Sequence, residues 1–322
     1  MQDMHRAPPE LLSSWKMLRK CPYIRPWERC SPDAAASQTG PAIDAETFLH
    51  VLGNRTLLLL GDSLQGQLFV AIACAMHGHV VASKIGWLPA GSVRTLSKRC
   101  GRQPHCHFFS GCVRFATGGQ LCWTQAHQPV TLQGVRPWVV KEVAKYSHPA
   151  KPLILAYGTL APTFTGGLAY EEFASAGRAE AEQLISAMSE SRPQPVALWR
   201  EMAAQHFAPR GGFFRGTLKD MDKTNVPTAN ESCVTHPSAE MERHNQWNVG
   251  SETPLRAAGV TLVRVWASTR DTFAAHVGRG DCTHFCQPGV PGQWAGMLAD
   301  ALGMAMSQID STKQFSSRSR RD

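Results

Sequence analysis

Four short apolar runs, with helix-like stretches between them, limit the folds open to this sequence. They cover residues 55–60, 152–157, 196–199 and 260–266. Each has the length of a strand buried in a sheet. Apolar residues recur at helical spacing after the first run and over 293–309, and residues 171–189 are rich in helix-forming Ala, Glu and Leu. This alternation predicts an α/β fold with a parallel sheet covered by helices on both faces.

Residues 113–124 have a different pattern. Apolar residues lie on both sides of Gly118-Gly119, a pair that is typical of a turn between antiparallel strands. The segment therefore predicts a β-hairpin.

The chain is long enough for one substantial core. It has 322 residues, of which 43% are hydrophobic and 18% charged, a balance typical of globular rather than disordered or fibrous proteins. We expect an irregular segment over 1–46 packed on the core, one main domain over 47–309 and a disordered tail over 310–322. We also expect a monomer.

The charge of the chain is moderately positive. Thirty-three basic and 25 acidic side chains give +8, spread along the chain. No basic patch is interleaved with aromatic residues, so we expect no nucleic-acid partner. A preference for acidic glycans stays open.

Ten cysteines favour either disulfides or a metal site. Residues 100–122 contain four of them, with His105 and His107, which could imitate a metal site. The Gly, Pro and Arg residues around them favour local disulfides instead, and we expect no metal.

Disulfides require an oxidising compartment. Two sequons, at Asn54 and Asn230, would permit glycosylation there. Residues 1–20 lack the apolar core of a signal peptide, however, and no window has the length of a membrane span. We expect a protein of the secretory pathway, in the Golgi lumen or outside the cell, whose leader or anchor is absent from this chain. The alternative is a cytosolic protein with free thiols.

Gly61-Asp62-Ser63 stands where the first apolar run meets the first helix. A serine in a sharp strand-to-helix turn exposes its hydroxyl near backbone N–H groups, as a nucleophile requires. The tripeptide alone fits a helix N-cap equally well.

Asp281 precedes His284 by three residues near the end of the sequence. A carboxylate at this spacing can accept the Nδ1–H of the imidazole and leave Nε2 free to take the proton of Ser63. A surface ion pair is the simpler alternative for the motif alone.

Together these motifs resemble the PC-esterase group of the SGNH superfamily, which includes the plant trichome-birefringence-like polysaccharide O-acetyltransferases. The resemblance rests on Gly61-Asp-Ser63, on Asp281-Cys-Thr-His-Phe-Cys-Gln-Pro-Gly289 with Trp294 in the next helix, and on Cys21-Pro-Tyr-Ile with Cys30. It implies a three-layer αβα sandwich of the SGNH, flavodoxin-like, type, with a disulfide-stapled N-terminal segment.

The resemblance also implies three disulfides, carried over by motif position. They are Cys21–Cys74, Cys30–Cys286 and Cys233–Cys282. The cysteines at 100, 106, 112 and 122 would then pair among themselves.

The sequence departs from the family at the oxyanion hole. The strand that should end in an Asn-bearing turn reads Leu155-Ala-Tyr-Gly-Thr159. Gly158 suits a close backbone approach, and Gln65, Gln67 or Thr159 could substitute for the missing amide. Loss of one such donor costs about a hundredfold in turnover.

Two further positions follow the third apolar run, where α/β sites gather. Arg200 and His206 are predicted either to contact substrate or to have buried, hydrogen-bonded roles. Residues 236–247 are polar, and we interpret them as a solvated loop, with the lining of a glycan groove as the alternative.

The resemblance implies an acyl-serine intermediate and transfer of an acetyl group to a carbohydrate hydroxyl. We therefore expect a polysaccharide O-acetyltransferase that uses an acetyl donor, such as acetyl-CoA, as co-substrate and no bound cofactor. A carbohydrate acetyl-esterase is the alternative. A catalytically weak glycan-binding or structural protein is the alternative of another class.

Overall fold

The computed structural model describes most of the chain. The described residues are 43–85, 110–125, 132–149, 151–160, 170–207, 233–278, 281–287 and 289–318.

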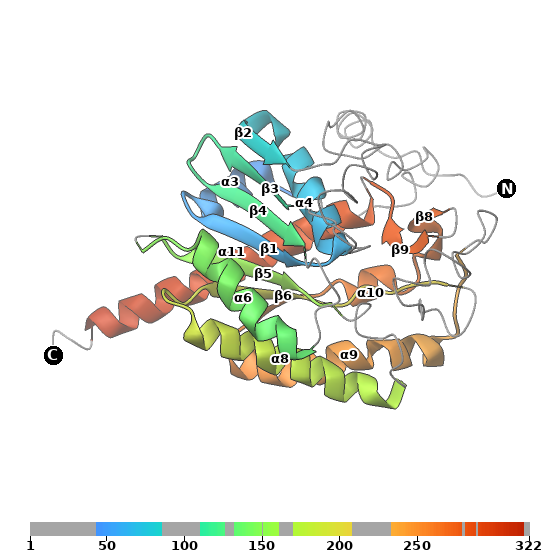
Figure 1. The fold of residues 1–322 in the computed structure, drawn as a ribbon. Coiled ribbons are helices and arrows are strands. Elements are labelled where there is room, and N and C mark those ends of the chain that lie inside the picture. The colour runs from blue at the N-terminus through green and yellow to red at the C-terminus, as the bar shows by residue number, and fades with distance from the viewer. Residues whose placement is uncertain are drawn as a thin grey trace, which may run out of the picture.

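A seven-stranded sheet forms the centre of the fold, in the order β2-β3-β4-β1-β5-β6-β7 (Figure 1). The strands are β1 (Thr56–Gly61), β2 (Val80–Ile85), β3 (Ser110–Phe115), β4 (Gln120–Gln125), β5 (Leu153–Gly158), β6 (Val196–Arg200) and β7 (Thr261–Val263). The five strands from β4 to β7 in this order are parallel, and β2 and β3 continue the sheet antiparallel. The sheet is thus mostly parallel, and the hairpin predicted over 113–124 supplies its antiparallel pair β3–β4.

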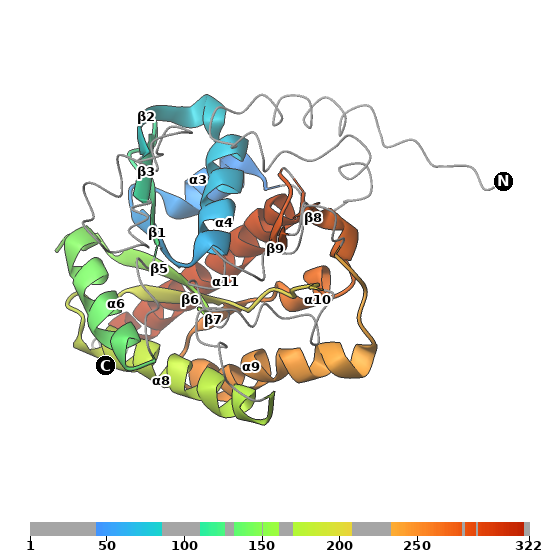
Figure 2. The same cartoon turned by 45° about the vertical axis from the view of Figure 1, so that its right-hand side comes forward.

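The leucines of β1 explain why helices cover both faces of the sheet. Because side chains alternate along a strand, Leu57 and Leu59 enter one apolar core and Leu58 and Leu60 the other. The first core lies under α3 (Ala45–Leu52), α4 (Ser63–Ala75) and α11 (Val290–Arg318). The second lies under α6 (Leu132–Tyr146) and α8 (Phe173–Glu190), with α9 (Ser238–Ala257) packed against α8 (Figure 2).

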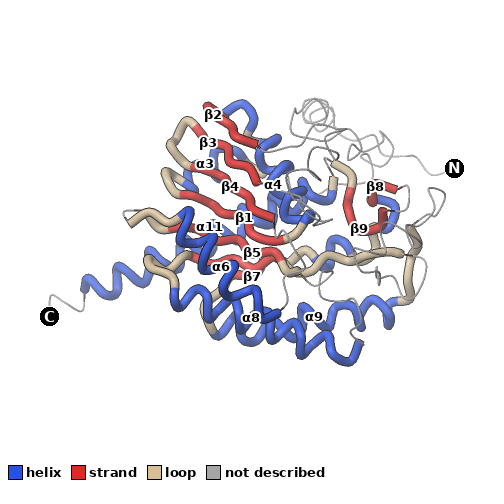
Figure 3. Tube along the Cα trace, viewed as in Figure 1, coloured by secondary structure: helices blue, strands red, loops and turns tan. Residues whose placement is uncertain are grey.

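A separate two-stranded sheet stands beside the N-terminal end of α4 (Figure 3). It consists of β8 (His276–Gly278) and β9 (Asp281–Phe285), which pair antiparallel. One turn of helix, α10 (Trp266–Thr269), and three 3₁₀ turns complete the described elements: His77–His79, Tyr170–Glu172 and Phe273–Ala275.

The structure confirms the α/β alternation, the hairpin and the helix that begins at Ser63, and it corrects several boundaries. The boundary expected at residue 46 falls inside α3. Strand β7 covers only part of the run 260–266, which continues into α10. Helix α11 extends to Arg318, so much of the tail expected over 310–322 is helical. Among the described residues, no helix combines the length and the apolar character that a membrane crossing needs.

The largest correction concerns residues 236–247, which we interpreted as a solvated loop. Most of this segment belongs to helix α9. His244 and Trp247 are fully buried there, because α9 packs against α8 at close range. Sequence polarity misled the interpretation, since a buried polar group such as Trp247 Nε1 finds its partner, Glu180, 67 residues away in the chain.

Candidate active site at the junction of β1, α4 and β9

Ser63 is the first residue of α4, directly after β1. The preceding Asp62 caps the helix, because its Oδ1 accepts from the N–H groups of Leu64 (2.9 Å) and Gln65 (3.3 Å). A side chain at Gly61 would come within 2.8 Å of the Gly158 carbonyl oxygen, so the turn requires glycine. Local sequence thus fixes the serine at the end of the central strand.

His284 contacts this serine from β9. Its Nε2 lies 2.6 Å from Ser63 Oγ, and its Nδ1 lies 2.8 Å from Asp281 Oδ2. A carboxylate only accepts hydrogen bonds, so the Nδ1 atom carries the proton and Nε2 faces the hydroxyl as an acceptor. The side chains of His284 and Asp281 are 19% and 32% exposed and Ser63 is half-buried, so the three groups are reachable from solvent.

Asp281 is held in its charged form. Burial alone would raise the pKa of Asp281, but the charge of His284 and hydrogen bonds from the His284 side chain and from the backbone N–H groups of His284 and Thr283 outweigh it, and the pKa is lowered to about 2. The carboxylate is therefore negative at neutral pH, where it can stabilise a protonated His284.

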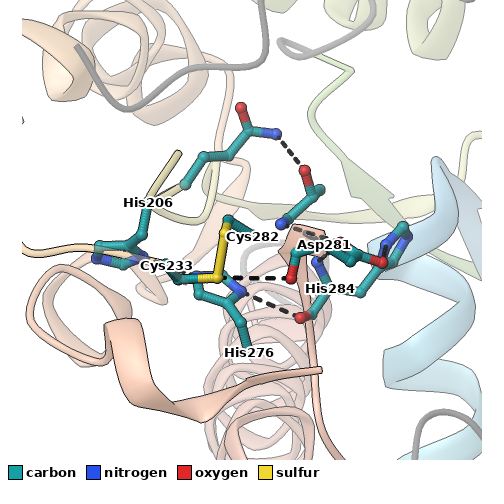
Figure 4. Close-up of a disulfide and its surroundings, with 8 residues drawn as sticks. His206, Cys233, His276, Asp281, Cys282 and His284 are labelled. Carbon is teal, nitrogen blue, oxygen red and sulfur yellow. Dashed lines mark hydrogen bonds and ion pairs between the residues drawn. A yellow bond between two sulfur atoms is a disulfide. The ribbon is translucent and has the colours of Figure 1, made fainter. Parts of the chain in front are cut away.

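Side chains from outside the hairpin fix β9 beside α4. Gln67 of α4 donates from Nε2 to the Phe285 carbonyl (2.7 Å) and accepts from the Phe285 N–H (3.1 Å). The disulfide between Cys233 and Cys282, the second residue of β9, ties this strand to the segment that leads into α9 (Figure 4). Gln205 Nε2 adds a hydrogen bond of 3.0 Å to Thr283 Oγ1.

Arg200 lies behind the turn that carries Ser63, with 1% of its surface exposed. Its Nε donates to Gln65 Oε1 (2.8 Å), its Nη1 to the Glu201 carbonyl (2.7 Å), and its Nη2 lies 3.5 Å from Asp62 Oδ1. Burial raises the pKa of Asp62, and the charge of Arg200 opposes this effect. Arg200 is therefore a buried support of the turn.

These contacts bear on four predicted residues. Gln67, Arg200 and His206 are buried and bonded to protein groups, which for Arg200 and His206 agrees with the buried, hydrogen-bonded alternative. Gly158 is buried too, and a side chain there would meet atoms of Gln65 and Arg200 at 2.7–2.9 Å. A side chain at 158 would therefore displace the ends of these two side chains, and the role of Gly158 in an oxyanion hole stays a prediction.

The proposed substitutes for the missing asparagine are engaged elsewhere. Gln65 Nε2 donates to the Ala156 carbonyl (2.7 Å), and Thr159 Oγ1 donates to Glu180 Oε2 (2.6 Å). Gln67 Nε2 donates to the Phe285 carbonyl, so each of the three groups makes a hydrogen bond to another part of the protein. The Ser63 N–H is then the remaining donor of the first turn, because Asp62 occupies the next two.

Sequence reasoning missed Glu180, which organises the chain after β5. Its buried carboxylate accepts from four donors, Tyr157 Oη (2.8 Å), Thr159 Oγ1 (2.6 Å), the Leu160 N–H (2.8 Å) and Trp247 Nε1 (2.8 Å). Burial raises the pKa of Glu180, and the hydrogen bonds oppose it. Its position four residues before the core residue Leu184 was the available signal, because that spacing places it on the apolar face of α8.

The disulfides agree with the resemblance as far as the described residues reach. Cys233–Cys282 is confirmed, and Cys112 pairs with Cys122 across the β3–β4 hairpin. The latter pair removes two of the thiolates that a metal site over 100–122 would need. Cys74 and Cys286 are each disulfide-bonded. Their expected pairings lie outside the described residues, as do the following positions: Cys21, Cys30, Cys100, His105, Cys106 and His107.

Comparison with known proteins adds no assignment: no family model matches the chain, and no curated protein matches it.

Proposed function

We propose that the protein is a serine-dependent O-acyltransferase of the SGNH type, related to the PC-esterase group, that moves an acetyl group onto a carbohydrate hydroxyl. The single observation that carries the proposal is the 2.6 Å contact between Ser63 Oγ and His284 Nε2, backed by the Asp281 carboxylate on the other ring nitrogen. Two segments 221 residues apart meet there in the geometry that serine nucleophiles require.

In the first half-reaction Ser63 Oγ attacks the acetyl carbonyl carbon of the donor. The hydroxyl proton passes to His284 Nε2, and Asp281 stabilises the imidazolium. The tetrahedral intermediate then collapses, its bond to the donor breaks, and His284 returns the proton to the leaving group. An acetyl-serine remains.

In the second half-reaction His284 takes a proton from the acceptor hydroxyl, whose oxygen attacks the acetyl-serine. The Ser63 oxygen leaves with the proton from His284. A sugar as acceptor makes the protein a transferase, and water as acceptor makes it an esterase. The resemblance favours the sugar.

In this proposal, backbone N–H groups stabilise the oxyanion of the tetrahedral intermediate. The Ser63 N–H stands at the positive end of the α4 dipole, which favours a developing negative charge. Because Gln65, Gln67 and Thr159 donate to other protein groups, we expect slower turnover than in enzymes that direct a side-chain amide at the oxyanion.

The proposed setting is the secretory pathway. Four of the described cysteines form two disulfides, Cys112–Cys122 and Cys233–Cys282, which fit an oxidising compartment.

Intact-mass measurement tests the proposal. The oxidised protein is incubated with an activated acetyl ester, and we expect one acetyl adduct that Ser63→Ala abolishes. Ser189→Ala serves as the matched control, because that hydroxyl is exposed on α8. His284→Gln should slow the formation of the adduct by about a thousandfold or more.

The decay of the adduct separates the two chemistries. Faster loss in the presence of acetyl-accepting oligosaccharides than in water alone indicates a transferase, and equal loss indicates an esterase. A folded protein that forms no Ser63 adduct would contradict the proposal and favour the glycan-binding alternative.

A further inference from the structure

Two buried imidazoles stand behind His284, outside the group of three residues assigned to the reaction. His206 is 0% and His276 7% exposed, and His206 Nδ1 lies 2.7 Å from His276 Nε2 (Figure 4). His276 begins β8, and its ring lies beside the strand that carries His284. The short distance identifies a hydrogen bond between two ring nitrogens.

The outer nitrogens of the pair both face carbonyl oxygens. His206 Nε2 lies 2.9 Å from the Arg270 oxygen, and His276 Nδ1 lies 3.0 Å from the main-chain oxygen of His284. Carbonyl oxygens only accept hydrogen bonds, so each outer nitrogen must carry a proton. Two neutral imidazoles have one N–H each, and both of these are then used.

The contact between His206 Nδ1 and His276 Nε2 therefore lacks a proton unless the pair binds a third one. With two protons, either two lone pairs face each other at 2.7 Å or one of the carbonyl groups loses its donor. With three protons, all three hydrogen bonds are made at once.

We propose that His206 and His276 share a third proton as a buried imidazole–imidazolium pair, and that His276 is thereby a positioning residue for His284. The link is the hydrogen bond from His276 Nδ1 to the His284 carbonyl, which fixes the main chain under the catalytic imidazole. The positioning role rests on the proposed function, whereas the proton count does not.

Several groups favour the extra proton. The ring of Phe285 stacks on that of His276 with centroids 4.3 Å apart and planes at 25°, and an aromatic face attracts a cation. The carboxylate of Asp281 favours a charge on His276, and that of Asp271, which is itself paired with Arg270, favours one on His206.

Other groups oppose it. Burial lowers the pKa of both rings, and the charges of His206 and His284 lower that of His276 further. His236, two residues before α9, acts in the same direction on His206. Burial and mutual repulsion exclude two charges on the pair, so a single shared proton is the most that it binds, and it is lost as the pH rises.

Nuclear magnetic resonance of protein labelled with ¹⁵N in histidine counts the protons directly. About one pH unit below the ordinary imidazole pKa of about 6.5, we expect three protonated nitrogens among the four of the pair, with the inner proton strongly shifted downfield. The signals are assigned by their loss in His206→Leu and His276→Phe. Two protonated nitrogens at that pH, with the protein folded, would overturn the shared proton.

Kinetics test the positioning role. His276→Phe removes the donor to the His284 carbonyl, and we expect kcat to fall by about tenfold or more while KM changes little. In His206→Asn, the new amide can donate to His276 Nε2 without an extra proton. His206→Asn should therefore retain more activity than His206→Leu. Its pH profile of kcat should lack the inflection that titration of the shared proton causes.

The outcomes separate the two proposals. If Ser63 forms no adduct but three protons are counted, the proposed function fails and the proton pair stands. If kcat and the pH profile of folded His276→Phe match those of the wild type, the positioning role is wrong. If His276→Phe does not fold, the two variants of His206 decide. Higher activity in His206→Asn than in His206→Leu supports the positioning role, and equal activities with identical pH profiles refute it.

Discussion

At the scale of single residues, two carboxylates accept hydrogen bonds that hold the chain around the site in place. Asp281 faces solvent in part and accepts from His284, whereas Glu180 is sealed in the interior and accepts from four donors. Each is stabilised by hydrogen bonds to its charged form. Loss of the charge should therefore have measurable and different consequences at the two positions.

For Asp281 the consequence is a dependence of stability on acid. Its pKa falls from the ordinary 3.8 to about 2 in the folded protein, so the contribution to stability is full above pH 4 and is lost as the pH falls towards 2. With allowance for solvent, we expect Asp281→Asn to lower the free energy of unfolding by about 2 kcal/mol at neutral pH. Urea unfolding across this pH range measures it. A difference between the two proteins that does not shrink in acid would contradict the assignment.

For Glu180 the consequence is a mismatch of donors. An amide in Glu180→Gln places N–H groups against Thr159 Oγ1, Trp247 Nε1 or the Leu160 N–H, and at least one buried donor loses its acceptor. We expect a loss of about 1–3 kcal/mol in the free energy of unfolding. Glu182→Gln, exposed on the same helix, is the matched control and should change stability by less than about 0.5 kcal/mol.

At the scale of elements, two glycines allow α8 and α9 to pack at backbone distance. A Cβ at Gly177 would lie 2.2 Å from the Trp247 carbonyl oxygen, and one at Gly250 would lie 1.9 Å from that of Ala174. This close contact brings Trp247 within reach of Glu180 and so fixes the chain after β5. The packing of α8 against α9 thus supports the candidate site indirectly, through Glu180 and the chain after β5.

Alanine substitutions test this packing. Gly177→Ala and Gly250→Ala should each lower the free energy of unfolding by about 1–3 kcal/mol or more, because backbone rather than a flexible side chain stands in the way. Gly303→Ala is the control: nothing lies within 4 Å of a Cβ there, and in the middle of α11 alanine should stabilise by up to about 1 kcal/mol. Equal effects at all three positions would refute the tight contact.

At the scale of the whole molecule, disulfides join segments that are separated in the sequence. The Cys233–Cys282 disulfide closes a loop of 49 residues and the Cys112–Cys122 disulfide one of 10. The loop-entropy relation gives about 4 kcal/mol for the first and about 3 kcal/mol for the second. Only the first reaches the strand that carries His284.

Paired cysteine-to-alanine variants distinguish these links. We expect Cys233→Ala/Cys282→Ala to cost about 4 kcal/mol of stability and also to slow the acetylation of Ser63. Cys112→Ala/Cys122→Ala should cost about 3 kcal/mol and leave the rate for the remaining folded protein nearly unchanged. Equal rates in the two double variants would show that the disulfide does not position β9.

The sequence predicted the parts of the molecule that depend on local pattern. Ser63 was found because strand and helix periodicities meet at it, and His284 because Asp281 stands at a fixed offset in the same strand. Buried polar roles escaped prediction, since whether Gln67 or His206 is inside depends on partners such as Phe285, 218 residues away, and His276, 70 residues away.

The hairpin of β8 and β9 shares no strand ladder with the seven-stranded sheet. Its sequence can therefore diverge without disturbing the strand pairing that holds the turn with Ser63. Exchange of its surface positions, with Asp281, Cys282, His284 and Phe285 kept, would reshape the rim of the candidate site and leave the seven-stranded sheet intact. In the proposed reaction, the hairpin is thus the place where acceptor choice can be changed at little risk to folding.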